Sequence, residues 1–108
     1  MLVKVNSSAV NGLSAMPVFI EINTLPGKEF FMVGLPDNAV RESRTRVESA
    51  LLSSGYHLRE AKITVNFAPA DVRKEGSGYD LPLAVGLLAA SHLVPTEALE
   101  NNVFTGEL

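Results

Sequence analysis

The segment from Leu83 to Ala90 constrains the fold most, because it reads Leu-Ala-Val-Gly-Leu-Leu-Ala-Ala and would be apolar on every side of a helix. A helix that is hydrophobic all round must be buried, so the rest of the chain has to cover it. We expect this helix to run from Asp80 to about Leu93. Pro82 fits the first turn, where a missing N–H is tolerated, and Pro95 ends the helix.

The first third of the chain alternates between apolar and polar side chains, a pattern typical of strands. We expect strands at 2–5, 18–24, 29–34 and 61–67. The turn Leu25-Pro26-Gly27-Lys28 predicts a hairpin that joins the second and third of these strands. Residues 30–33 are apolar on both faces, which predicts that the third strand lies inside the sheet with a covering layer on each side, or beside a partner.

A further helix is expected after Asp37, whose carboxylate can cap it, and it should end near Ser54 with Gly55 as its C-cap. Its buried stripe is predicted to consist of Val40, Val47, Ala50 and Leu51. Residues 103–108 begin like a last strand. The element order βββ-α-β-α-β therefore predicts a two-layer α/β (α+β) domain in which helices pack against a mixed sheet.

Composition excludes several classes of protein. The 108 residues have room for one domain, and 46% hydrophobic against 19% charged residues predicts a globular fold. The absence of cysteine excludes disulfides and thiolate metal sites. No apolar stretch reaches the length of a membrane span and no secretory signal begins the chain, so we expect a cytoplasmic protein. The net charge of −3 makes tight binding to DNA phosphates a poor expectation for the isolated segment.

The loop from Asp71 to Asp80 is the most distinctive stretch. Gly76 and Gly78 precede a helix, so the turn from Gly76 to Asp80 could present backbone N–H groups to a phosphate or carboxylate. The alternative, which we favour, is that both glycines provide positive φ angles for a tight turn and that Ser77 or Asp80 caps the helix.

Ser77 could be a nucleophile only if a base lay beside it, and Lys74 is the base nearest in sequence. Lys74 lies between Arg73 and Glu75, so we expect a solvated ammonium with an ordinary pKa. We therefore expect no catalytic residue here. His57 and His92 have no second ligand at metal-binding spacing and are interpreted as structural. A nucleotide-phosphate loop of the form G-x-x-x-x-G-K-[ST] is absent from the sequence.

The basic residues allow two interpretations. Arg41, Arg44 and Arg46 together with Arg73 and Lys74 could form a surface for phosphates. We favour the alternative that Glu42 with Arg46 and Arg44 with Glu48 form i,i+4 ion pairs on a solvated helix face. The candidate anion or nucleic-acid contacts are Arg41, Arg44, Arg73, Lys74, Gly76, Ser77 and Gly78.

Residues 31–44, 63–84 and 104–108 resemble the N-terminal domain of the Mg-chelatase-like AAA+ proteins of the YifB/ComM family. The resemblance rests on the strings VGLPD-AV-ES and ITVN-APAD-KEGS-DLP and on Phe-Thr-Gly-Glu-Leu, in that order. It implies a fold similar to the Lon protease domain and the C-terminal domain of RadA, a superfamily named after the second domain of a ribosomal protein. A left-handed βαβ crossover is a feature of that superfamily.

The resemblance to Lon argues against a peptidase. Lon-type proteases place their nucleophile two residues after the glycine of a K-(D/E)-G string, which is Gly78 here, so Ser77 is one residue out of place. The partner lysine would follow Thr105-Gly106-Glu107, beyond Leu108. A degenerate serine peptidase and an anion-binding module thus stay as alternatives.

The resemblance also implies a larger parent protein. In the full-length family an AAA+ module follows, which binds ATP and Mg, and ComM-type members resemble hexameric DNA motors that promote branch migration during natural transformation. Residues 1–108 are then the N-terminal part of a truncated, non-catalytic accessory domain without a cofactor or metal of its own. Its expected partners are the AAA+ module, further copies of the same chain and DNA. We also expect an exposed apolar edge, or a self-association that hides it.

Overall fold

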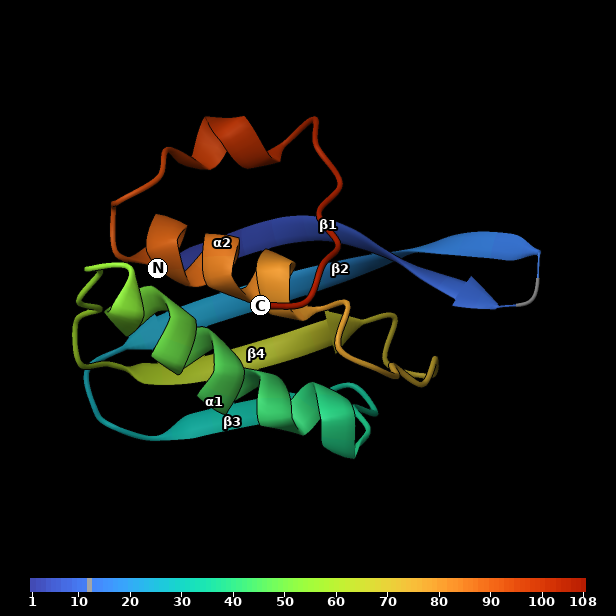
Figure 1. Ribbon diagram of the computed structural model, residues 1–108, viewed down its shortest axis with the longest axis horizontal. Coiled ribbons are helices and arrows are strands. Elements are labelled where there is room, and N and C mark those ends of the chain that lie inside the picture. The colour runs from blue at the N-terminus through green and yellow to red at the C-terminus, as the bar shows by residue number, and fades with distance from the viewer. Residues whose placement is uncertain (12) are drawn as a thin grey trace.

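A computed structural model describes residues 1–11 and 13–108, and it has two layers, a four-stranded sheet and two helices on one face of that sheet (Figure 1). The elements are β1 (Leu2–Asn11), β2 (Ser14–Leu25), β3 (Phe30–Val33), α1 (Asn38–Ser53), β4 (Lys62–Ala68), α2 (Asp80–Ala90) and a short 3-10 helix η1 (Thr96–Leu99). The predicted α+β architecture with a mixed sheet is confirmed. The last predicted strand is wrong, because residues 103–108 make one isolated bridge, between Val103 and Asn6, and otherwise run as coil.

The order of strands in the sheet is β1-β2-β4-β3, which differs from the expected neighbours. β2 pairs antiparallel with β1 and β4, and β3 pairs parallel with β4. The predicted hairpin between β2 and β3 is therefore wrong, because β4 lies between them. β3 is also an edge strand and not an interior one. Phe30 and Met32 pack towards the helices, whereas Phe31 and Val33 are about half exposed, at 49% and 48%, on the uncovered face.

The connection from β3 through α1 to β4 is left-handed. Figure 1 views the sheet from the helix side, with β3 and β4 both running from left to right. The chain leaves β3, passes in front of the sheet as α1 and enters β4 one position higher. Nearly all such crossovers are right-handed, so this hand is a specific property of the fold. It agrees with what the family resemblance implies.

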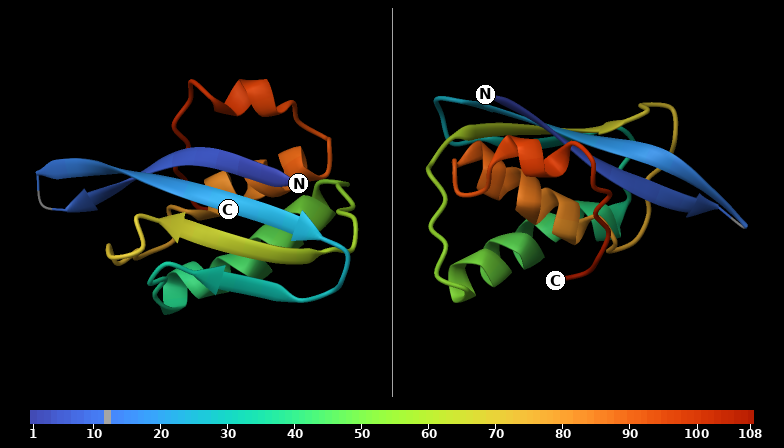
Figure 2. Two further views of the ribbon diagram at one scale, coloured as in Figure 1. Left: turned by 180° about the vertical axis from the view of Figure 1, so that it is seen from behind. Right: turned by 90° about the horizontal axis from the view of Figure 1, so that it is seen from above.

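The core lies between the sheet and the two helices, and the other face of the sheet is uncovered, as the two views in Figure 2 show. Its fully buried side chains include Val18, Ile20 and Ile22 of β2, Val65 and Phe67 of β4, Val40 and Val47 of α1, and Leu83 of α2. The predicted buried helix is confirmed, although α2 ends at Ala90. Gly86 lets α2 lie very close to the sheet, since a Cβ there would be 2.3 Å from Cδ1 of Ile22.

The expected N-cap of α1 is present, and the C-cap lies one residue before the expected Gly55. The Asp37 carboxylate accepts a hydrogen bond from Val40 N at 2.8 Å. Ser54 occupies the C-cap position and Gly55 follows with a φ of 87°. Three of the four residues predicted for its stripe are buried, namely Val40, Val47 and Leu51.

Candidate functional site: two loops joined at Lys74

Two loops meet where β3 and β4 end, and their backbones are bonded to each other. Lys74 N donates to Leu35 O at 3.0 Å, and Asp37 N donates to Lys74 O at 3.0 Å. Leu35 adopts a φ of 58° and Gly34 a φ of 103°. A Cβ on Gly34 would lie 2.1 Å from the carbonyl oxygen of Phe67, so only glycine fits this approach. The junction between the loops is therefore rigid.

The side chain of Lys74 is fully buried in this junction. Its Nζ donates to the carbonyl oxygen of Gly34 at 2.7 Å and also to that of Pro69. Burial lowers the pKa of the Lys74 ammonium below its ordinary value, and the nearby Asp71 carboxylate partly opposes this shift. The expected solvated lysine with an ordinary pKa is wrong, because two backbone carbonyls replace water around the amine. Lys74 also cannot belong to a basic surface.

Asp37 connects the junction to the start of α1. While one carboxylate oxygen caps the helix, the other accepts from Gly76 N at 3.3 Å. Tyr79 is buried next to this region, with its ring 5.8 Å from that of Phe67 in an edge-on arrangement. Burial raises the pKa of the Tyr79 hydroxyl, and the negative charges of Asp37 and Glu75 raise this pKa further.

The start of α2 contains a buried ion pair. Asp80 is fully buried, and Arg46 reaches it from α1 with Nε 2.7 Å from Oδ2 and Nη2 2.9 Å from Oδ1. The same Nη2 donates to Ala39 O at 2.7 Å. The hydrogen bond to Asp80 raises the pKa of the Arg46 guanidinium. Leu108 N donates to the same carboxylate at 3.2 Å, so one aspartate joins three segments.

The sequence did not predict this ion pair. It favoured Arg46 on a solvated helix face and Asp80 as a cap of the second helix. The predicted contact of Arg46 with Glu42 exists at 3.6 Å, but Asp80 is the closer partner. The proposed caps of α2 are wrong, because Tyr79 occupies the N-cap position and no side chain there makes a capping hydrogen bond. A helix-face arginine and a buried aspartate 34 residues later carry no local signal of their pairing.

Several N–H groups in and after the turn from Gly76 to Asp80 already have a partner. Gly76 N donates to Asp37, Asp80 N to Ser77 O at 3.2 Å, and Leu81 N to Gly106 O at 3.0 Å. Gly76 has the predicted positive φ, of 82°, and Gly78 does not. The carbonyl of Gly78 instead accepts from Gly106 N at 2.9 Å. The segment 105–108 thus covers the beginning of α2 where an anion would have to bind.

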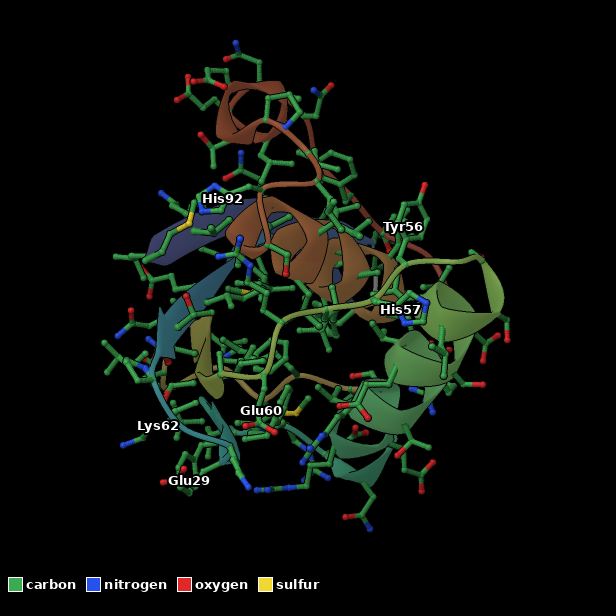
Figure 3. All side chains as sticks on the ribbon, turned by 90° about the vertical axis from the view of Figure 1, so that its left-hand side faces the viewer. Glu29, Tyr56, His57, Glu60, Lys62 and His92 are labelled. Atoms are coloured by element: carbon green, nitrogen blue, oxygen red, sulfur yellow. The ribbon has the colours of Figure 1, made fainter. Side chains whose placement is uncertain are left out.

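The proposed nucleophile and base are not joined. Lys74 Nζ is directed to two backbone carbonyls, and no hydrogen bond links it to the Ser77 hydroxyl in the part of the chain that the structure describes. His57 and His92 are both exposed and lie on separate segments, after α1 and after α2 (Figure 3). Residues 1–11 and 13–108 contain no group of three His, Asp or Glu side chains that could hold a metal ion.

The predicted basic surface is divided into separate parts. Arg44 pairs with Glu48 at 2.9 Å, which confirms that i,i+4 pair, and its guanidinium lies 4.4 Å from the centre of the Phe30 ring. Arg73 pairs with Glu75 at 3.2 Å on the loop. Arg41 and Arg73 do line one shallow pocket beside Asp37. Arg73 also lines the groove beside Gly78, so the predicted contacts that share an accessible surface in the described chain are Arg41 with Arg73 and Arg73 with Gly78.

Comparison with known proteins decides the family. A family model described as subunit ChlI of Mg-chelatase matches residues 20–108. The chain belongs to this family. It is 50% identical over 107 residues to the YifB protein of Salmonella typhimurium and 44% identical over 105 residues to the competence protein ComM of Haemophilus influenzae. Both alignments cover 96% of this chain but 21% of the relative, so the chain spans about a fifth of the length of these proteins.

The relatives include mycobacterial proteins, such as one from Mycobacterium tuberculosis that is 43% identical over 105 residues. The YifB/ComM resemblance derived from the loop motifs is thus confirmed. None of the described helices is both long enough and apolar enough to cross a membrane.

Proposed function

We propose that this chain is a non-catalytic accessory domain of a cytoplasmic, bacterial Mg-chelatase-like AAA+ ATPase and that it acts by binding other protein subunits. The observation that carries the proposal is the bonding at the loop junction. Lys74, Asp80 and Arg46 are held by backbone carbonyls or by one another, so these three side chains build a scaffold and are not available as reactive groups. ATP and Mg are assigned to the AAA+ module of the longer protein.

The fold supports the same proposal. We infer that the domain belongs to the superfamily that includes the Lon protease domain and the C-terminal domain of RadA. The left-handed β3-α1-β4 crossover favours this assignment, because such crossovers are rare elsewhere. A peptidase of that superfamily would have its nucleophile at the position of Gly78, and the alternative pair of Ser77 and Lys74 is not joined, because Lys74 Nζ donates to backbone carbonyls.

Subunit contacts are favoured over DNA contacts as the mode of action. Arg44, Arg46 and Arg73 each have a carboxylate partner and Lys74 is buried, so four of the nine basic side chains are not available to DNA on a chain of net charge −3. DNA stays the second candidate because Arg41 and Arg73 share a pocket. The relative named competence protein ComM supports a role of the longer protein in competence. We propose that the longer protein acts in natural transformation as a hexamer, as the family resemblance implies.

A replacement experiment tests the accessory role. The matching fifth of ComM from Haemophilus influenzae would be exchanged for this chain in one variant and deleted in another. We expect the exchange to preserve oligomerisation and ATPase activity, and the deletion to impair assembly measured by light scattering. The proposal fails if the deleted protein assembles and hydrolyses ATP like the wild type.

A DNA titration at low salt separates the second candidate. The chain would be compared with an Arg41→Glu, Arg73→Glu double variant, and with Arg59→Glu and Arg44→Glu together as a control of equal charge. DNA contact predicts salt-sensitive binding that only the first double variant abolishes. If the unmodified chain shows no salt-sensitive binding, the DNA mode is excluded for this domain.

A further inference from the structure

The hairpin of β1 and β2 extends beyond the rest of the sheet as a two-stranded arm (Figures 1 and 2). We define the arm as residues 8–11 and 14–17, which pair with each other from Ser8 opposite Pro17 to Asn11 opposite Ser14. β4 pairs with β2 only from Phe19 onwards. The arm therefore has no third strand from the described part of the chain.

The arm has an unusual composition for a part that projects into solvent. From Val5 to Ile20 the sequence contains no Asp, Glu, Lys or Arg, although 19% of the chain is charged. Val10 is 78% exposed and Leu13 is fully exposed. Edge strands of soluble proteins are usually protected by charged side chains, and a two-stranded hairpin alone is marginally stable. Both properties indicate that the arm has a partner.

Only one edge of the arm can accept another strand. On the β2 side, Pro17 has no N–H to donate. Because the pairing of β1 with β2 continues on both sides of Pro17, its nitrogen faces away from β1 and interrupts strand pairing at the outer edge of β2. On the β1 side Asn6 O already faces outwards, since it accepts from Phe104 N at 2.9 Å. Backbone groups alternate sides along a strand, so Ser8 and Val10 also direct N–H and C=O to this edge.

The β1 edge of the arm is unpaired within the described chain, and the arm is not packed tightly on the body. A groove of about 480 Å³ lies between them, lined by Ser8, Ala9, Val10 and Met16 of the arm and by Val72, Arg73, Glu75, Gly78, Tyr79 and Thr105 of the body. No backbone hydrogen bond to Ser8 or Val10 from another segment is found within the described chain, apart from the β1–β2 ladder. A further extended strand can thus reach the outward N–H and C=O groups.

We propose that this strand is the β1 arm of a second copy, so that two arms pair antiparallel through Ser8 to Val10 into a four-stranded ribbon. An uncharged edge is complementary to itself, whereas the bodies carry a net charge of −3 and repel one another. The arm lies along the longest dimension of the molecule, 38 Å, and so holds the two bodies apart. This pairing rests on the proposed function, because it identifies the contact through which the domain would bind another subunit.

Sedimentation equilibrium of this chain over a wide concentration range tests the pairing. Val10→Pro removes one outward N–H without touching the β1–β2 ladder, while Val10→Ala removes the side chain and keeps that N–H. We expect the unmodified chain to form dimers, Val10→Ala to dimerise within a fewfold of it, and Val10→Pro to raise the dissociation constant at least tenfold. Far-ultraviolet circular dichroism and a thermal melt check that each variant folds.

Disulfide trapping gives a second measurement, because the chain has no cysteine. Ala9→Cys, which this pairing places directly opposite its own copy, should form a covalent dimer on mild oxidation much faster than Ser53→Cys, an exposed control at the end of α1. A monomer at all concentrations, a dimer unaffected by Val10→Pro, or equal trapping through Ser53→Cys would each overturn the proposal. These results are independent of the ComM replacement, which can fail or succeed whatever the arms do.

Discussion

Replacing Lys74 by methionine probes the buried amine at the loop junction. Methionine keeps most of the volume but removes the donor to the carbonyl oxygens of Gly34 and Pro69. Pro69 O keeps a second partner, Val72 N at 3.3 Å, whereas Gly34 O loses its bond to Lys74. An unsatisfied buried carbonyl costs about 1–3 kcal/mol, so we expect the free energy of unfolding to fall by about 2 kcal/mol at pH 7. For a domain of this size that lowers Tm by about 10 °C.

The pH dependence gives the sharper test. Burial lowers the pKa of Lys74 in the folded chain, so between that pKa and the ordinary lysine value of about 10.5 the unfolded chain binds more protons. The free energy of unfolding must then rise with pH in this window. Below the pKa that Lys74 has in the folded chain, Lys74 makes no contribution to the pH dependence. The raised pKa of Tyr79 acts in the opposite direction only as the unfolded tyrosine ionises, near pH 10.

Urea unfolding followed by circular dichroism between pH 7 and pH 9.5 measures this rise. The unmodified chain and Lys28→Met, which removes an exposed lysine, should gain stability over that range relative to Lys74→Met. Parallel profiles for all three proteins would refute the claim that Lys74 is desolvated in the folded state. Equal stability of Lys74→Met and the unmodified chain at pH 7 would refute the role of the two carbonyl bonds.

Three further substitutions test other contacts. Asp80→Asn removes the buried charged partner of Arg46 and leaves the exposed Glu42, so it should cost about 2 kcal/mol in urea unfolding. An Arg46→Met, Asp80→Leu double variant should recover part of that loss, and a loss below about 0.5 kcal/mol would contradict the ion-pair account. Gly34→Ala should lower Tm by more than 10 °C, because the new Cβ would meet the carbonyl oxygen of Phe67. Gly55→Ala, which has open space around it, should lower Tm by about 5 °C or less, and equal shifts of the two variants would show that the positive φ alone matters. Gly86→Ala should be destabilising in a thermal melt and partly rescued by Ile22→Val, which removes the clashing Cδ1; absence of rescue would contradict the close packing of α2 on β2.

Local patterns were sufficient for most elements of the fold. Alternation located the strands, and the all-apolar run located α2, since both depend only on neighbouring residues. The neighbours in the sheet could not be read in this way, because the β3–β4 pair is parallel and is closed by a crossover of about thirty residues. The residues of β3 are apolar on both faces, and this pattern is compatible with an exposed edge strand as well as with an interior strand.

The site was less predictable, because its bonds connect distant segments. Lys74 stands between two charged residues and is bonded to carbonyls from two loops, one of them 40 residues away. The charges beside it in sequence favoured solvent, but the backbone bridge to Leu35 and Asp37 turns its side chain inwards. The family motif identified the loop correctly without indicating which of its side chains would be buried.

The carboxylate of Asp80 gives the domain a mechanical property. It receives Arg46 from α1 and the backbone N–H of Leu108, and it begins α2 itself. A pull applied at residues 106–108 is therefore divided between both helices, through this carboxylate and through the bonds of Gly106 with Gly78 and Leu81. The bonds of residues 103 and 104 with Asn6 pass the rest of the load to β1. In the assembly that we propose, such a joint would make the helical layer move as one body.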